Sequence, residues 1–336
     1  MQSIEPDLNF SPSGRVEPRH LGLILAEGPD VATFLQGQLT HDVLLLPEGQ
    51  ARLAGYCSAK GRLMSSFIVL KVSTEQFILI CHRDLLQSTL KRLSMFVMRA
   101  KVKLVDASSQ FEIRGLLGHA VENAFAQVQT FPAWSVLKNL NAYVIKLHDA
   151  KTSHTSCHRA LWIAPQGDPS LHVLETSTPT LLTEEDWLLA EVLSGISMVQ
   201  TATAEAFVPQ MLNYESVDGV SFKKGCYPGQ EVVARSQFRG TLKRRAYVVS
   251  CASALQVGQE VYSSEDAAQA CGTVASAAPL RGITSKVDPD PNLQTGAWWG
   301  IVSMQTSAAK HSIHLQQFDG PALKVWALPY PLLEDI

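Results

Sequence analysis

The sequence of 336 residues lacks the features that mark several protein classes. It has no apolar run of the ~20 residues that a membrane-spanning helix needs. Its first twenty residues carry five charges and no apolar core of a secretion signal. We therefore expect a cytoplasmic location and no membrane partner. The formal net charge of −3 provides no global field that would attract nucleic acid, so a nucleic-acid role would need a local basic patch.

Cysteine is present but scattered, and no two of the six cysteines form a Cys-x-x-Cys pair. In a chain of this length without a secretion signal, that distribution indicates free thiols and no disulfide framework. We also expect no bound metal. The sequence contains no glycine-rich phosphate loop, no Ser-His-Asp order and no internal repeat, so the architectures that depend on them are not indicated.

Hydrophobic periodicity predicts a chain of the α+β class. Strands are expected at residues 20–26, 51–57, 63–72, 77–81 and 101–105, with residues 58–62 forming the turn of a hairpin. An amphipathic helix is expected at residues 83–98, because leucines recur there at spacings of three and four. A second helix is expected at residues 184–193, with Thr183 as its N-cap.

The texture of the sequence changes near Leu242. Short apolar segments separated by Gly and Ser turns follow, which is typical of a small β-barrel. We therefore divide the chain into a flexible N-terminal arm (1–18), a body of two intertwined subdomains (19–241) and a C-terminal β-barrel domain (242–336). An exposed loop is expected at residues 282–296.

One short segment concentrates chemically useful residues. Residues 221–235 read Ser-Phe-Lys-Lys-Gly-Cys-Tyr-Pro-Gly-Gln-Glu-Val-Val-Ala-Arg. Pro228 and Gly229 predict a type II turn, because proline presets φ and glycine accepts a positive φ. Cys226 is thereby expected at the lip of a turn, and the residues after Glu231 have the composition of a strand.

The surroundings of Cys226 allow two interpretations. In the first, Lys223 and Lys224 favour its thiolate, Glu231 orients a lysine or accepts a proton, and the thiol faces a ligand. In the second, Cys226 is buried at the end of a strand and the lysines are solvated. The segment contains no histidine, so a Cys–His nucleophile is not indicated.

Several segments together resemble the YgfZ family. Residues 222–231 are similar to its Lys-Gly-Cys-(Tyr or Phe)-x-Gly-Gln-Glu signature, and residues 207–213 to its Phe-x-Pro-Gln-x-x-Asn stretch. Residues 34–42 look like its Gln-Gly-Gln-x-Thr-x-Asp element, residues 56–62 like the hairpin that follows, and residues 238–244 like its basic segment. The segments occur in the family's order and span nearly the whole chain.

The resemblance implies a fold like that of aminomethyltransferase, the T-protein of glycine cleavage. That fold is a folate-binding α+β body with ferredoxin-like βαβ elements, closed by a C-terminal β-barrel. The resemblance further implies binding of tetrahydrofolate or another reduced folate, and support of iron–sulfur enzymes or assembly proteins. Through these partners the chain would affect tRNA modification indirectly. Cys226 would be the functional thiol, with Lys224 and Glu231 beside it.

The resemblance also implies a set of folate-binding residues. Trp187 matches a family tryptophan that lines the folate site, and Lys60 and Arg62 would receive the anionic folate tail. From residue type alone, a tryptophan packed in the core is an equally good interpretation of Trp187, and an exposed turn with two solvated charges is the favoured interpretation of Lys60 and Arg62. Glutamines of the 34–42 segment would fix the channel wall or cap a helix end. The full set is Trp187, Lys60, Arg62, Gln36, Gln38, Tyr227 and Arg235.

Two departures from the family pattern bear on activity. Leu21 lies near the place of a second family tryptophan, and Leu193 stands where the T-protein has its pterin-binding glutamate. Lack of this carboxylate argues against aminomethyl transfer, so a factor without enzymatic turnover is favoured. Two alternatives stay open. One is a folate-dependent one-carbon transferase, and the other is a protein- or RNA-binding scaffold that uses the basic residues between 235 and 245.

Overall fold

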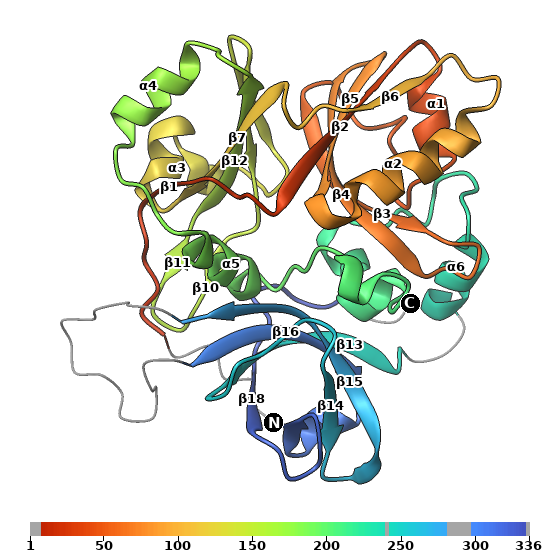
Figure 1. Cartoon of the computed structure of the whole chain (residues 1–336), viewed down its shortest axis with the longest axis vertical. Helices are drawn as coiled ribbons and strands as arrows, with labels where there is room; N and C mark the ends of the chain where they lie inside the picture. The colour runs from red at the N-terminus through yellow and green to blue at the C-terminus, as the bar shows by residue number, and fades with distance from the viewer. Residues whose placement is uncertain (1–7, 239–241, 281–296, 334–336) are drawn as a thin grey trace.

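The computed structural model describes residues 8–238, 242–280 and 297–333. Two five-stranded sheets stand side by side, and a closed barrel lies below them in the view of Figure 1. The α+β class and the C-terminal barrel expected from the sequence are both present. Within the described ranges, no helix is long and apolar enough to cross a membrane.

The first sheet is built from the N-terminal third of the chain. Its elements are β2 (Leu21–Glu27), α1 (Val31–Gln36), β3 (Gln50–Cys57), β4 (Leu63–Ser73), β5 (Gln76–His82), α2 (Arg83–Val97) and β6 (Lys103–Asp106). The strand order is β3-β4-β5-β2-β6, and all neighbours are antiparallel. Since β5 and β6 both flank β2, they run parallel and α2 connects them, which is the ferredoxin-like split βαβ unit. Leu35 of α1 and Leu86 of α2 pack on one face of this sheet.

The second sheet has the order β1-β7-β12-β9-β8, again antiparallel. Its elements are β1 (Gly14–Val16), β7 (Phe111–Leu117), α3 (His119–Ala124), β8 (Val136–Asn139), β9 (Ala142–Lys146), β12 (Arg159–Pro165) and α4 (Ser170–Ser177). A 3-10 turn (Val128–Thr130) and a two-stranded ribbon of β10 (Ala150–Lys151) and β11 (Ser156–Cys157) accompany it. Val121 of α3 and Leu174 of α4 pack in one apolar cluster with Trp162 of β12.

The barrel follows the order β13-β16-β15-β14-β17-β18 and closes on itself. Its strands are β13 (Arg244–Cys251), β14 (Glu260–Ser263), β15 (Asp266–Pro279), β16 (Trp298–Gln305), β17 (Ile313–Leu315) and β18 (Ala322–Trp326), with a 3-10 turn at Ala308–Lys310. Closure pairs every strand edge, which removes the exposed edges of an open sheet.

The two sheets and the barrel share one core. Leu23 of the first sheet, Ile145 of the second and Trp299 of the barrel belong to the same apolar cluster. Helix α5 (Glu184–Leu193) lies between the second sheet and the barrel, as Figure 1 shows. Three 3-10 turns (Thr201–Thr203, Pro209–Leu212 and Tyr214–Val217) and α6 (Gln230–Phe238) complete the body. Because the three units share buried side chains, segments between them are held in fixed positions.

The N-terminal segment differs from the flexible arm that we expected. From Leu8 onward it is packed: Leu8 and Phe10 are buried, and β1 pairs with β7. The hydroxyl of Thr155 donates a hydrogen bond to the carbonyl of Phe10. Charged and proline residues suggested a loose arm because its apolar residues are few, but those few insert into the shared core. Residues 1–7 and the expected exposed loop at 282–296 lie outside the described residues.

The segment after Glu231 is a helix, and the strand-like interpretation was wrong. The two adjacent valines, Val232 and Val233, favour strands by composition. The turn at Gly229 instead directs the chain into α6, with Glu231 in its first turn and Arg235 in its last, an arrangement that suits the helix dipole. Val233 and Gln237 are four residues apart and both buried, so one side of the helix faces the protein.

Candidate functional site

Cys226 lies on an exposed loop between the last 3-10 turn of the body and α6. It is the exposed one among six free cysteines; the other five are buried. Burial raises the pKa of the Cys57 and Cys81 thiols to about 12 and that of Cys157 to about 11. These buried thiols are therefore neutral and shielded at physiological pH, and the Cys226 thiol is the accessible one.

Lys224 fixes the base of this loop. Its buried ammonium donates hydrogen bonds to the carbonyl oxygens of Gln36 and Leu39 at the end of α1, and it lies 4.8 Å from the centre of the Tyr227 ring. Burial lowers the pKa of Lys224 to about 8, although the nearby Asp42 opposes that shift. The lysine thus anchors the loop to α1 while its charge stays close enough to interact with the Cys226 thiol. Its neighbour Lys223 is exposed.

The hairpin turn at residues 58–62 packs directly against the turn after Cys226. Gly229 has a φ of +78°, and a methyl group on it would lie 2.4 Å from the carbonyl oxygen of Ser58 and 2.5 Å from Gly61. Only glycine fits such a position. Arg62 donates a hydrogen bond to the carbonyl of Ala206 at 2.6 Å, so it holds the chain just before residues 207–213. Lys60 is exposed.

The segment that begins at Gln36 ties the loop to the first sheet. The side-chain oxygen of Gln36 accepts a hydrogen bond from the Val43 amide at 2.9 Å. The hydroxyl of Thr40 donates to Gly219 at 2.6 Å and accepts from the Gly55 amide at 2.7 Å. The amide oxygen of Gln38 is buried without a partner among the described residues. The Gln36 side chain therefore stabilises the loop between residues 36 and 43.

Residues 207–213 pack against α6. Gln210 is fully buried, and its amide donates to the carbonyl of Val233 at 2.7 Å. Asn213 has a φ of +59° and exchanges two hydrogen bonds with the backbone of Ala246 in β13. The segments that carry the family resemblance, far apart in sequence, thus converge around one loop. On α6 itself, Glu231 and Arg235 are both exposed.

Trp187 occupies a different place, between α5 and the second sheet. It is fully buried, its indole N–H donates to Glu191 at 3.0 Å, and Arg159 stacks over its ring at 4.9 Å. Glu191 also pairs with His20 at 3.5 Å and with Arg159 at 3.8 Å. Three buried partners thus engage this carboxylate, and Leu193, further along α5, is buried.

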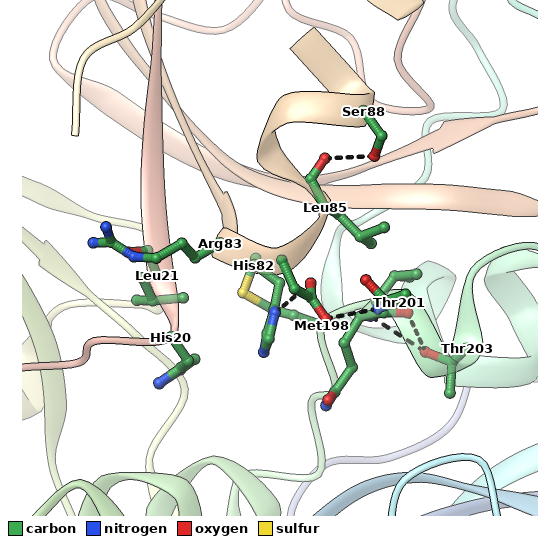
Figure 2. Close-up of polar contacts among 12 residues, drawn as sticks. His20, Leu21, His82, Arg83, Leu85, Ser88, Met198, Thr201 and Thr203 are labelled. Atoms are coloured by element: carbon green, nitrogen blue, oxygen red, sulfur yellow. Dashed lines mark hydrogen bonds and ion pairs between the residues drawn. The ribbon is translucent and has the colours of Figure 1, made fainter. Parts of the chain in front are cut away.

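The His20 side chain belongs to a charged cluster between the sheets. Burial opposes its charge, but Glu191 and Glu184 outweigh burial and raise the pKa of His20 to about 9. Figure 2 shows His20 facing His82, with ring centres 5.6 Å apart. His82 pairs with Asp84 at 2.6 Å, and Asp84 accepts a hydrogen bond from the Thr201 amide at 2.9 Å. The cluster links β2, β5, α5 and the segment after α5.

A cavity of about 210 Å³ lies beside β9 and the C-terminal segment. Its lining combines Phe131, Lys146, Leu147, His148, Asp149, Lys151 and Tyr330 with four further residues. His148 lies in edge contact with the rings of Trp134 and Tyr330, and its buried Nε2 has no hydrogen-bond partner among the described residues. Burial and the charges of Arg159 and Lys146 lower the pKa of His148 to about 4, so the ring is neutral.

None of the residues expected to bind folate lines this cavity. Sequence reasoning missed it because its walls come from segments almost 200 residues apart, and only the run Lys146–Asp149, with three ionisable side chains, offered a local signal. Of the basic residues between 235 and 245, Arg239 lies outside the described residues and two others bind groups within the protein. Arg245 is buried and paired with Glu215, and Arg244 donates to the carbonyl of Cys271. Among the described residues, no group of three or more potential metal ligands gathers.

Comparisons with known proteins define the class first. No protein-family model matches the chain. Among solved structures, aminomethyltransferase T of the glycine cleavage system from Bartonella henselae is similar with a TM-score of 0.67 and 14% identity, covering 96% of this chain and 87% of that one. The protein therefore has the aminomethyltransferase fold.

Curated sequences then narrow the class to one family. The tRNA-modifying protein YgfZ of Photorhabdus laumondii is 30% identical over 328 residues, covering 94% of this chain and 91% of that protein. The protein of the same name from Photobacterium profundum is 35% identical over 234 residues, covering 68% and 67%. The chain belongs to the YgfZ family.

Proposed function

We propose that the chain is a folate-binding factor that supports iron–sulfur cluster assembly or repair, with Cys226 as its functional thiol. Its effect on tRNA modification would be indirect, through iron–sulfur enzymes, which agrees with the name that its relatives carry. The observation that carries the proposal is the convergence of separate sequence segments on one exposed thiol. Lys224 attaches this loop to the end of α1, and Gly229 packs it against the hairpin turn.

The proposed role of Cys226 is a shared or transient contact. An iron–sulfur cluster needs four ligands, usually thiolates, and the five other cysteines are buried away from the loop surface. We therefore propose that the thiol meets a cluster or a client protein whose own ligands complete the set. Lys224 stabilises the loop that presents the thiol, and the exposed Glu231 and Arg235 would contact the client.

We propose the cavity beside β9 as the place for the pterin ring of a reduced folate. The lining suits such a ring: Phe131 and Tyr330 contribute aromatic side chains, and His148 and Asp149 contribute polar ones. The cavity is smaller than the ~300–1,000 Å³ of pockets that enclose a whole drug-sized ligand. The tail would therefore extend outward, where Lys151 is exposed. The sequence-derived alternative for the tail is Lys60.

A folate-dependent one-carbon transferase is the second candidate, favoured by the shared fold. Transfer chemistry of the T-protein type would require a carboxylate at the position of Leu193. Glu191 does not replace it, because His20, Arg159 and Trp187 already engage its carboxylate. We therefore favour a factor without turnover.

The thiol role is tested in cells that lack their own YgfZ-family gene. The chain is expressed as wild type, as Cys226→Ala, and as Cys271→Ala, which removes a buried thiol of the barrel. Thiolated tRNA nucleosides are then quantified by mass spectrometry. We expect the wild type and Cys271→Ala to restore them and Cys226→Ala to restore little. Equal restoration by Cys226→Ala at equal protein level would refute the role of the thiol.

A further inference from the structure

A basic and apolar surface covers the outer side of α2 and the turn that follows it. We call it the α2 surface, and it consists of Lys91, Arg92, Met95, Phe96, Met98, Arg99, Lys101 and Lys103. Met95, Phe96 and Met98 are 70%, 44% and 86% exposed. Neighbouring large apolar side chains with such exposure are unusual on a soluble protein and mark interaction sites.

Helical spacing places these residues on one side of α2. Lys91 and Met95 are four residues apart, as are Arg92 and Phe96, so each pair lies on neighbouring turns of the same side. Leu86 and Leu93, which are buried, mark the side of α2 that packs against the first sheet. Figure 1 shows α2 lying across that sheet, in front of the strands.

The backbone of the turn is unusual as well. Met98 ends α2 with a φ of +44°, a region that residues other than glycine rarely adopt. Its side chain is nevertheless almost fully exposed. The energetic cost of this backbone conformation is therefore not offset by packing of the Met98 side chain within the described residues. Strain of this kind is often associated with a binding role.

The charge of this surface is of one sign. Residues 88–103 contain five basic and no acidic residues, while the whole chain has a net charge of −3. Within the described residues, none of the five cations forms an ion pair. Two acidic groups adjoin the surface: Asp30, which accepts a hydrogen bond from the Lys101 amide, and Glu27, opposite Lys103 in the β2–β6 ladder. Arg92 also interacts with the hydroxyl of Tyr56, whereas the exposed Lys91, Arg99, Lys101 and Lys103 present positive charge to solvent.

We propose that the α2 surface docks an acidic amphipathic helix of a partner protein. The apolar side of the partner helix would cover Met95, Phe96 and Met98. Its carboxylates would pair with the lysines and arginines at both ends of the α2 surface. Unbranched methionines adapt to an irregular partner surface, and an apolar centre with a charged rim is the usual layout of a protein interface. Single-stranded nucleic acid would call for several aromatic rings to stack on, and this surface has one.

The test uses a fluorescein-labelled helical peptide with leucines along one side and glutamates elsewhere. Its affinity for the full chain is measured by fluorescence anisotropy. We expect Phe96→Glu to weaken binding at least about tenfold, as for a central interface residue. Arg92→Glu combined with Arg99→Glu should weaken it similarly and should bind a lysine version of the peptide instead. The matched control is Val173→Glu on α4, where valine is 66% exposed, with affinity unchanged.

Circular dichroism melts establish that each variant is folded. The proposal is overturned if the peptide does not bind the wild type, or binds Phe96→Glu and Val173→Glu equally well. It is also overturned if the wild type binds RNA or phosphatidylserine vesicles but not the acidic peptide, and Phe96→Glu abolishes that binding. A concentration-dependent dimer of the wild type that Phe96→Glu dissociates would replace the partner helix with a second copy.

Discussion

At the scale of single residues, alanine substitutions of the two glycines on either side of Cys226 should have different effects on stability. Gly229 has a positive φ and no room for a methyl group, whereas nothing lies within 4 Å of a methyl group on Gly225. We expect Gly229→Ala to lower the free energy of unfolding by about 1–3 kcal/mol and Gly225→Ala to change it by less than about 0.5 kcal/mol. Urea denaturation followed by circular dichroism measures both. Equal effects would contradict the docking of the two turns.

The thiols provide a second prediction at this scale. Because Cys226 is exposed and the other five cysteines are buried, Ellman's reagent should titrate one thiol in the folded protein and six in urea. Cys226→Ala should remove the fast-reacting thiol and leave the slow ones. A second fast thiol in the native state would show that the structure assigns burial wrongly.

His20 predicts a dependence of stability on pH. Its pKa is raised above the ordinary 6.5 to about 9. The charged ring therefore stabilises the fold fully below pH 6.5, and the contribution is lost as pH rises through 9. His20→Asn should destabilise the protein by about 2 kcal/mol at pH 6 and by much less at pH 10. Chemical denaturation at the two pH values measures this; equal losses would contradict a charged His20.

At the scale of elements, some predictions held because the signal was local. The N-cap of α5 is Thr183, which forms a reciprocal capping box with Asp186. The hairpin of β3 and β4 also follows from a local turn flanked by apolar runs. In α6 the local signal failed, because long-range contacts hold the helix: Val233 is buried in the shared core, and its carbonyl accepts a hydrogen bond from Gln210. Such tertiary contacts leave no trace in a short window of sequence.

Two neighbouring valines test the orientation of α6. Val233 is fully buried and Val232 is 38% exposed. We expect Val233→Ala to lower the free energy of unfolding by about 2 kcal/mol, since it leaves a cavity, and Val232→Ala to lower it by less than about 0.5 kcal/mol. Urea denaturation distinguishes them. Equal losses for the two variants, or a larger loss for Val232→Ala, would contradict this orientation of α6.

At the scale of the whole molecule, the candidate site was only partly predictable. The sequence singled out Cys226 because its surrounding motif is contiguous. It did not indicate that Lys224 anchors α1 or that Trp187 is enclosed by Arg159 and Glu191. The cavity depends on how the second sheet meets the C-terminal segment, which brings His148 to Tyr330. Such a long-range arrangement is fixed by the shared core and is not encoded in any single segment.

The most direct test of the central claim is calorimetric titration of the purified chain with tetrahydrofolate. We predict saturable binding at one site, weakened at least about tenfold, or 1.4 kcal/mol, in His148→Ala and retained in Lys60→Ala and Cys226→Ala. Circular dichroism confirms that each variant is folded. Absence of binding to the wild type would contradict a folate-binding factor, and loss in Lys60→Ala with His148→Ala intact would move the ligand from the cavity to the hairpin turn.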